Sequence, residues 1–340
     1  MTHSKVSLSL CAALLSVLLS LNSLARAQDT TATPKVPDLV ETAFRYGDFA
    51  ELERLYAIYG KPGVRSPLTG MERLTHFWMG VGKITDSNLR VTEIYYTQMD
   101  AMTSKWATEH PQSVLAQLLY AKSLSAHAWF FRGTGFADTV SPTSWAAFKK
   151  YLNLALDQLQ RNAALAANDS SWNRQVLDVG RGLGWNAQRL LPVFESGIAK
   201  NPDDDELYFD MQMSLLPKWG GDLETVERFI ATVDQRTRDK RGMEMYARLY
   251  ANLSYQQVKQ LLFSSTQVSW PKMKSGFDDL LSRYPHSDHR NRYAYFACMA
   301  NDREVLQEQI ALIGDSFERI FWGSSPERRF DECRAMVKKS

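Results

Sequence analysis

Residues 141–163 show most clearly which fold the chain adopts. The stretch reads SPTSWAAFKKYLNLALDQLQRNA, and its large apolar side chains recur every three or four residues, at Trp145, Phe148, Leu152, Leu156 and Leu159. This spacing places them on one face of an α-helix. Ser141 precedes Pro142, which suits the first turn of a helix. We therefore expect a helix here that buries one apolar stripe against its neighbours.

Stripes of the same kind run along most of the chain. They begin near Val91, Ala187 and Leu223, and Asp222 is placed to cap the last of these helices. Alternating, strand-like segments between hairpin turns are almost absent. These patterns predict an all-α protein.

The expected helices are joined in a recurring way, because one helix ends at a Pro or Asn-Asp turn and the next begins at once. These boundaries lie at Pro111, Asn168-Asp169, Pro202 and Pro285. Asp169 and Pro202 are separated by nearly the tetratricopeptide period of about 34 residues, and Ala43–Phe49 resembles the turn inside such a repeat. A single helix pair cannot bury its apolar stripe, whereas stacked pairs can. We predict tetratricopeptide-like stacked helical hairpins in an irregular α-solenoid.

The N-terminal 27 residues have the pattern of a secretory signal peptide. Lys5 precedes an apolar stretch from Val6 to Leu21, and Ala25-Arg26-Ala27 provides a cleavage motif. The stretch is shorter than the roughly 20 residues of a membrane-spanning helix, although an uncleaved anchor is the alternative. We expect a signal peptide over 1–27, a disordered lead-in over 28–37 and a single helical-repeat domain over 38–340. The mature protein is expected to be periplasmic or secreted by a bacterium, with no membrane span.

The composition is that of a globular chain, with 340 residues of which 44% are hydrophobic and 23% are charged. It contains 40 basic and 38 acidic residues, and removal of Lys5 and Arg26 with the signal peptide leaves equal numbers. A neutral chain lacks the broad positive surface that nucleic acids attract. We expect no nucleic-acid partner.

Two cysteines, Cys298 and Cys333, remain after removal of the signal peptide. In an oxidising compartment they can form a disulfide bond. Alternatively, both are small buried apolar residues on neighbouring helices. A zinc site would need His286 and His289 as further ligands, and their sequence context is that of a helix start. We expect no metal and no other cofactor.

Two phrases of the sequence resemble a bacterial family. The first is AWFFRGTGFA over residues 128–137, and the second is LPKWGG over residues 216–221. Together they resemble a family of bacterial domains of unknown function that is built on tetratricopeptide-like helices. The resemblance covers about residues 105–260 and implies the fold, but it implies no activity.

The same phrases contain the candidate binding residues. Arg132 is placed either to donate to loop carbonyls or to pair with Asp138, and as a functional residue it would anchor an anionic group of a partner. The candidate aromatic contacts are Trp129, Trp145 and Trp219, which otherwise fill grooves between helices. The glycines expected to form turns within these phrases are Gly133, Gly135, Gly220 and Gly221.

The usual catalytic signatures are absent, including Gly-x-Ser-x-Gly, His-Glu-x-x-His and a phosphate-binding loop. The acidic run from Asp203 to Glu206 follows Pro202, so we interpret it as the first turn of a helix, where carboxylates complement the helix dipole. His127 lies among apolar residues and is interpreted as a core histidine. The sequence therefore predicts a non-enzymatic, exported protein that binds a protein or peptide through its groove. The alternative is a periplasmic hydrolase acting on cell-wall or glycan substrates through two carboxylates.

Overall fold

The computed structural model describes residues 35–85, 92–314 and 316–338. Within these ranges the chain is all-α, as predicted, and the nearest approach to a sheet is an isolated antiparallel bridge between Arg65 and Glu72. The expected signal peptide lies outside the described residues, as does the lead-in up to residue 34. The expected end of that lead-in is two residues too late, because helix α2 begins at Val36 and accommodates Pro37 in its first turn.

The first half of the described chain forms α2 (Val36–Arg45), α3 (Phe49–Tyr59), α4 (Arg73–Thr85), α5 (Glu93–Glu109), α6 (Val114–Arg132), η1 (Ala137–Thr139), α7 (Pro142–Arg161), α8 (Ser170–Gly182) and α9 (Ala187–Lys200). The second half forms α10 (Asp205–Ser214), η2 (Pro217–Trp219), α11 (Leu223–Arg241), α12 (Glu244–Leu253), η3 (Ser254–Val258), η4 (Lys259–Leu261), α13 (Leu262–Ser265), α14 (Trp270–Arg283), α15 (Ser287–Met299), α16 (Arg303–Ile313), η5 (Arg319–Phe321) and α17 (Pro326–Lys338).

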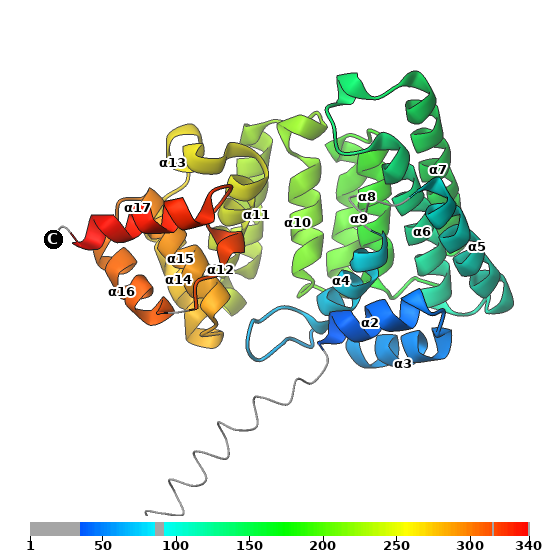
Figure 1. The fold of residues 1–340 in the computed structure, drawn as a ribbon, viewed down its shortest axis with the longest axis horizontal. Coiled ribbons are helices and arrows are strands. Elements are labelled where there is room, and N and C mark those ends of the chain that lie inside the picture. The colour runs from blue at the N-terminus through cyan, green and yellow to red at the C-terminus, as the bar shows by residue number, and fades with distance from the viewer. Residues whose placement is uncertain (1–34, 86–91, 315, 339–340) are drawn as a thin grey trace, which may run out of the picture.

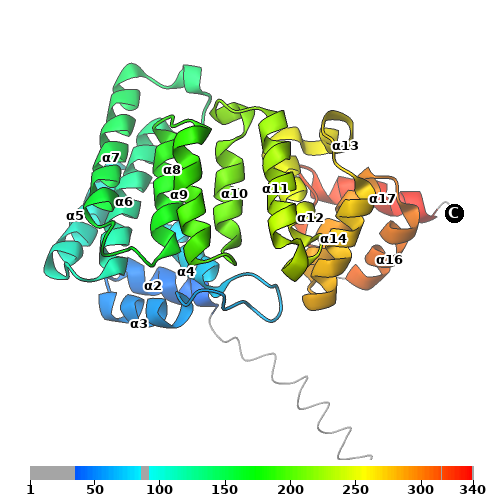
Figure 2. The same cartoon turned by 180° about the vertical axis from the view of Figure 1, so that it is seen from behind.

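The helices form an array in which chain neighbours pack together. Figure 1 shows α5 to α10 standing side by side, with α11 to α16 continuing the row towards the C terminus. Figure 2 shows the same order from behind, with α2 and α3 crossing one end of the N-terminal half. The most extensive contacts include those of α5 with α6, α6 with α7, α8 with α9, and α15 with α16. This packing is that of stacked helical hairpins.

Several helices begin where the sequence predicts. The Ser144 amide donates to Ser141 Oγ (3.1 Å), and the Thr225 amide donates to Asp222 Oδ1 (2.7 Å). Each contact satisfies an amide that has no partner inside its own helix. In the turn between α2 and α3, Gly47 has φ +66°, a conformation that favours glycine.

The core is continuous along the array. One cluster of buried residues joins α2 to α6, a second joins α6 to α8, and a third extends from α8 to α17. The half-buried Trp78 and Tyr120 pack against both the first and the second cluster. Trp185 and Val193 connect the second cluster to the third in the same way. Within the described ranges, no helix is long and apolar enough to cross a bilayer.

One connection leaves this regular order. Residues 60–72, which we call the crossing segment, join α3 to α4 and extend towards the C-terminal half (Figure 1). His289 Nε2 of α15 lies 2.8 Å from the carbonyl oxygen of Thr69. A Cβ atom at Gly70 would lie 2.4 Å from the Tyr284 ring, so only glycine fits this close approach. The crossing segment therefore joins parts of the array that are far apart in sequence.

Candidate functional site

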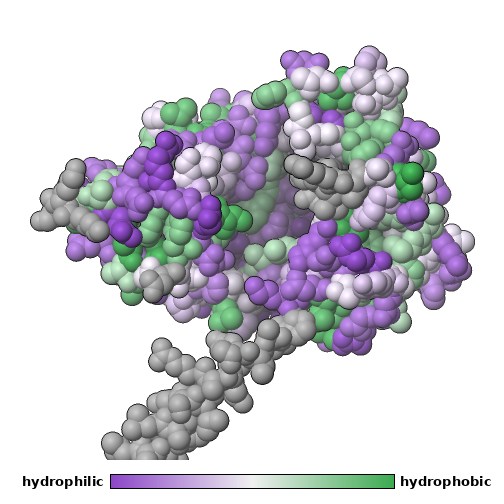
Figure 3. Space-filling view, in the orientation of Figure 1, coloured by the Kyte–Doolittle hydropathy of each residue, from purple (hydrophilic) through white to green (hydrophobic). Residues whose placement is uncertain are grey.

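A pocket of about 320 Å³ lies between α4, α6, α8 and α10. Its apolar wall includes Met71, Trp78 and Met79. Its polar wall consists of Lys122, Ser171, Arg174, Gln175, Asp178, Glu206 and Asp210. Figure 3 shows a hollow with a largely hydrophilic floor in the middle of the molecule, over the position that α10 occupies in Figure 1. We call this cavity the Arg174 pocket.

Helix geometry explains why the polar groups converge. Ser171, Arg174 and Asp178 lie three and four residues apart on α8, and Glu206 and Asp210 lie four apart on α10. Residues at these spacings share one face of a helix. Both helices are capped just before these faces, because Asp169 Oδ1 accepts from the Ser171 amide (2.8 Å) and Asp204 Oδ1 accepts from the Glu206 amide (3.2 Å).

Among the described residues, Arg174 is the only guanidinium that lines the pocket, and it faces three carboxylates. Its Nε lies 3.5 Å from Asp210 Oδ2, its Nη2 3.8 Å from Glu206 Oε2 and its Nη1 4.0 Å from Asp204 Oδ1. None of these contacts has the geometry of a hydrogen bond, and Nε and Nη1 are buried without a partner among the described residues. The guanidinium is therefore held by charge alone and retains unused donors.

The single positive charge of Arg174 therefore does not neutralise the three carboxylates around it. Burial raises the pKa of Glu206 to about 7, and the charges of Asp210 and Asp204 oppose its ionisation further. Burial also raises the pKa of Asp210 and the pKa of Asp204, against the attraction of Arg174. Near neutral pH, Glu206 therefore exchanges between its protonated and ionised forms.

The rest of the polar wall is partly paired. Asp178 accepts a hydrogen bond from Arg181, receives one from Ser125 Oγ (3.4 Å), and lies 4.0 Å from Lys122 Nζ. Gln175 is only 9% exposed, and its Nε2 is buried with no partner among the described residues. An unpaired buried amide is costly, so Gln175 adds a second unused donor to this wall.

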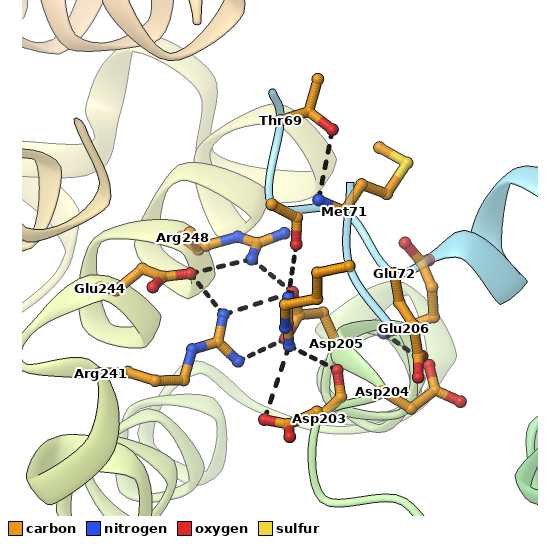
Figure 4. A network of polar contacts seen from close by, with 12 residues as sticks. Thr69, Met71, Glu72, Asp203, Asp204, Asp205, Glu206, Arg241, Glu244 and Arg248 are labelled. Atoms are coloured by element: carbon orange, nitrogen blue, oxygen red, sulfur yellow. Dashed lines mark hydrogen bonds and ion pairs between the residues drawn. The ribbon is translucent and has the colours of Figure 1, made fainter. Parts of the chain in front are cut away.

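Directly beside the pocket lies a second charged group, of which Figure 4 shows Asp205, Arg241, Glu244 and Arg248 at close range. Its members are Arg65, Asp205, Arg241, Glu244, Arg248 and Arg283, and we call it the Asp205 cluster. Asp205 accepts from Arg65 Nη1 (2.9 Å), from Arg241 Nη1 (2.5 Å) and from Arg248. Glu244 accepts from Arg241, from Arg248 (3.2 Å) and from Arg283 (3.0 Å).

In the Asp205 cluster, the arginines neutralise the negative charges of the carboxylates. The charges of Arg248 and Arg241, with the hydrogen bond from Arg65, hold the pKa of Asp205 well below its ordinary value despite burial. Arg65 also donates to the carbonyl oxygens of Gly70 (2.6 Å) and Asp203 (2.6 Å). The cluster therefore fixes the crossing segment to α10, and with it the Met71 wall of the pocket.

The candidate residues from the sequence lie elsewhere. Arg132 donates to the carbonyl oxygens of Gly135 and Gly133, and its guanidinium carbon lies 5.6 Å from the centre of the Trp145 ring. This geometry matches the expected contact with loop carbonyls, and no Asp138 contact occurs among the described residues. Trp129 meets Trp219 edge to face at 5.8 Å. The two family-like phrases thus come together, although none of these four residues lines the Arg174 pocket.

The expected turn glycines differ in their backbone conformation. Gly133 and Gly220 have φ of +64° and +86°, as a glycine turn requires, whereas Gly135 and Gly221 do not have positive φ. Gly221 is needed for another reason, because a Cβ atom there would lie 1.9 Å from the Leu215 carbonyl oxygen.

The two cysteines and His127 contact other residues of the protein core. Cys298 of α15 and Cys333 of α17 form a disulfide bond with a Cα–Cα distance of 5.6 Å. Their sulfurs bind each other, and no group of metal-binding side chains occurs in residues 35–85, 92–314 and 316–338. His127 is fully buried, with its Nδ1 2.6 Å from Asp100 Oδ2.

The Arg174 pocket was missed by sequence reasoning, which interpreted Asp203–Glu206 as a first helical turn. That interpretation describes Asp204, which is the N-cap of α10, but Asp205 and Glu206 enter two different charged groups. One signal was present in the sequence. Glu206 and Asp210 are like charges four residues apart, a pairing that disfavours a helix and therefore indicates another use.

Comparison with known proteins adds no assignment, because no family model, curated protein or solved structure matches the chain. The resemblance of residues 105–260 to a bacterial family remains a prediction from the sequence. The site is therefore interpreted from its own geometry.

Proposed function

We propose that this protein is a non-enzymatic binding protein of the bacterial envelope that takes a peptide segment of a partner into the Arg174 pocket. The observation that supports this most directly is the set of buried, unused donors on α8. Arg174 Nε, Arg174 Nη1 and Gln175 Nε2 have no partner among the described residues. Buried polar groups are normally satisfied, and a bound peptide brings carbonyl oxygens that accept from such donors.

The composition of the pocket also favours a peptide. Glu206 and Asp210 offer acceptors, Arg174 and Gln175 offer donors, and Met71, Trp78 and Met79 offer an apolar wall. A peptide presents N–H groups, carbonyl groups and side chains within a short length, so it can engage all three surfaces. Small-ligand sites commonly combine an apolar lining with a few converging polar groups.

Location in the envelope is part of the proposal. It rests on the signal-peptide pattern of residues 1–27. The disulfide bond between Cys298 and Cys333 agrees with it, since structural disulfides persist in oxidising compartments.

A library of random linear peptides, displayed on phage, tests the proposed function. Wild-type protein should select a consensus sequence, and Arg174→Ala should lose it while keeping the wild-type circular dichroism spectrum. Arg228→Ala is the matched control, because Arg228 is exposed on α11 and its partners among the described residues belong to the same helix. Absence of any consensus, or equal selection by Arg174→Ala, would overturn the proposal.

One observation favours the hydrolase as a second candidate. Glu206, with a pKa near 7, lies on the same helical face as Asp210, and a general acid must hold a proton at working pH. Incubation with purified peptidoglycan separates the two candidates. Soluble fragments released by wild type, and lost in both Glu206→Gln and Asp210→Asn, would establish the hydrolase, whereas intact peptidoglycan supports binding.

A further inference from the structure

In the described part of the chain, the Arg174 pocket has fewer cationic than anionic side chains. Asp204, Glu206 and Asp210 all form ion pairs with Arg174, and the charge of Arg181 also attracts Asp210. Of the other cations nearby, Arg181 and Lys122 lie beside Asp178, and Arg248 pairs with Asp205 and Glu244. Arg292 acts on Glu206 through its charge but forms no ion pair with a described residue. The charged groups around Glu206 are Lys122 of α6, Arg174 and Asp178 of α8, Asp204, Asp205 and Asp210 at α10, Arg248 of α12 and Arg292 of α15.

Two of the three carboxylates that line the pocket, Glu206 and Asp210, are open to an incoming group. The side chains of Glu206 and Asp210 are 29% and 28% exposed. Neither carboxylate accepts a well-formed hydrogen bond from a described residue, and the nearest nitrogen of Arg174 is 3.5 Å away. A cation with several N–H donors would supply both the missing charge and the missing hydrogen bonds.

A second observation indicates what lies next to that cation. Gln175 is nine-tenths buried, lines the same cavity and has an unpartnered Nε2, as Arg174 has unpartnered Nε and Nη1. These groups need acceptors, so the ligand must carry an oxygen acceptor close to its cation. The amino-terminal ammonium group of a peptide lies next to a carbonyl group, and a lysine ammonium reaches one when its side chain folds back. The apolar wall of Met71, Trp78 and Met79 suits a neighbouring aliphatic side chain.

We propose that Glu206 and Asp210 together bind the ammonium group of a peptide ligand, either its free amino terminus or a lysine side chain. The peptide carbonyl accepts from Gln175 and Arg174. This inference rests on the proposed function and defines its ligand class. The three N–H donors of an ammonium group match two converging carboxylates, and charge-assisted hydrogen bonds of this kind are among the stronger ones.

Binding of a cation has a defined pH dependence. The pKa of Glu206 is raised to about 7 in the free pocket, chiefly by burial, and a neighbouring ammonium favours the ionised form. Binding therefore releases a proton below pH 7, and affinity falls as pH decreases, by up to about tenfold per pH unit. Above pH 7 it levels off, until the ammonium loses its own proton near its pKa of about 8 for an amino terminus or about 10 for lysine.

Three tripeptides measured by isothermal titration calorimetry test this inference. Leu-Ala-Ala has a free amino terminus, N-acetyl-Lys-Ala-Ala has only the side-chain ammonium, and N-acetyl-Leu-Ala-Ala has none. We expect at least one of the first two to bind at least tenfold more tightly than the third at pH 7.5. Which of them binds identifies the source of the ammonium group.

Variants and pH provide the second part of the test. For wild type, the affinity of the binding peptide should fall about tenfold or more from pH 7.5 to pH 5.5, and Glu206→Gln should weaken binding and remove this dependence. Glu195→Gln is the control, because Glu195 is an exposed carboxylate that pairs with Arg236 away from the pocket. Glu195→Gln should behave as wild type.

The outcomes separate this inference from the proposed function. If N-acetyl-Leu-Ala-Ala binds as tightly as the other two peptides, or if affinity does not change with pH, the ammonium site is wrong and peptide binding stands. If none of the three peptides binds and the displayed library yields no consensus, both proposals fail. If the library yields a consensus without a free amino terminus or a lysine, only the ammonium site fails.

Discussion

Asp205 and Glu206 are neighbours in the sequence, yet their carboxylates have opposite environments. Asp205 accepts hydrogen bonds from three arginines, and its pKa is held well below the ordinary value. Glu206 shares one arginine with two other carboxylates, and its pKa is raised to about 7. Both side chains belong to the first turn of α10. The number of cations that each carboxylate faces therefore distinguishes a structural group from one that is available to a ligand.

The two regions also depend on different parts of the chain. The Asp205 cluster draws Arg65 from the crossing segment, Arg241 from α11 and Arg248 from α12. The Arg174 pocket is completed by Met71 at the end of the same crossing segment. The Asp205 cluster thus helps to form the Arg174 pocket, because the pairing of Arg65 with Asp205 positions one wall of the pocket.

The largest effect is expected from Asp205→Ala. This change leaves Arg65, Arg241 and Arg248 in a buried site with Glu244 as the closest remaining counter-charge, and removal of one partner from such a network costs about 3–5 kcal/mol. Urea unfolding at pH 7 measures the loss. Asp203→Ala is the matched control, since Asp203 is 41% exposed and 3.8 Å from Arg65, and it should cost less than about 1 kcal/mol. Equal losses for the two variants would contradict a structural role for the Asp205 cluster.

Replacement of Cys298 and Cys333 by serine provides a destabilised protein with an intact pocket. The disulfide bond closes a loop with a sequence separation of 35 residues, and its loss should cost about 3–4 kcal/mol in the chain-entropy model. Neither cysteine lines the pocket, so the affinity for the binding tripeptide should be unchanged. A parallel loss of affinity would show that the pocket depends on overall stability.

Arg65→Ala should act mainly on the crossing segment. Asp205 keeps Arg241 and Arg248, so the expected loss of stability is smaller, about 2 kcal/mol. Residues 61–72 lose the anchor that holds them to α10, and their amides should exchange with solvent deuterium faster than in wild type. Amides of α16, which contributes to neither region, serve as the internal reference. Unchanged exchange in residues 61–72 would mean that Arg65 is not the anchor.

The smallest effect on the free energy of unfolding is expected from Glu206→Gln, which should stabilise the protein and not destabilise it. The folded-state pKa of Glu206 lies above the value of 4.5 for an ordinary glutamate, so the folded protein loses stability as pH rises from about 5 to above 7. Glutamine cannot ionise, so the stability of Glu206→Gln relative to wild type should increase as pH rises from 5 to 7.5, as measured by urea unfolding at both pH values. Asp205→Asn should instead destabilise at both pH values.

The sequence predicts the helices well because their signals are local. The stripe from Trp145 to Leu159 is α7, and Asp222 caps α11 as expected. Side chains and caps at these positions interact within one helix or with the next, and periodicity reports such contacts. The tetratricopeptide type of the repeat remains a prediction, because comparison with known structures yields no match.

The site could not be predicted in the same way. Arg65 and Asp205 are 140 positions apart, and Thr69 meets His289 across 220 positions. Such contacts depend on how the crossing segment spans the array, which local patterns do not encode. The candidate residues Arg132 and Trp219 were conspicuous in the sequence because of their neighbouring glycines, yet the structure places them in loop and packing contacts.

The most direct measurement is the titration of the Glu206 side-chain carboxyl by carbon-13 nuclear magnetic resonance, with Glu206→Gln to assign the signal. In the free protein this carboxyl should titrate near pH 7. Saturating Leu-Ala-Ala or N-acetyl-Lys-Ala-Ala, whichever binds, should shift its pKa downward by one unit or more, because the ammonium group stabilises the ionised form. A Glu206 carboxyl that titrates near 4.5 in the free protein, or one whose pKa does not move with bound peptide, would contradict the claim that the Arg174 pocket has an excess of carboxylates that binds an ammonium group.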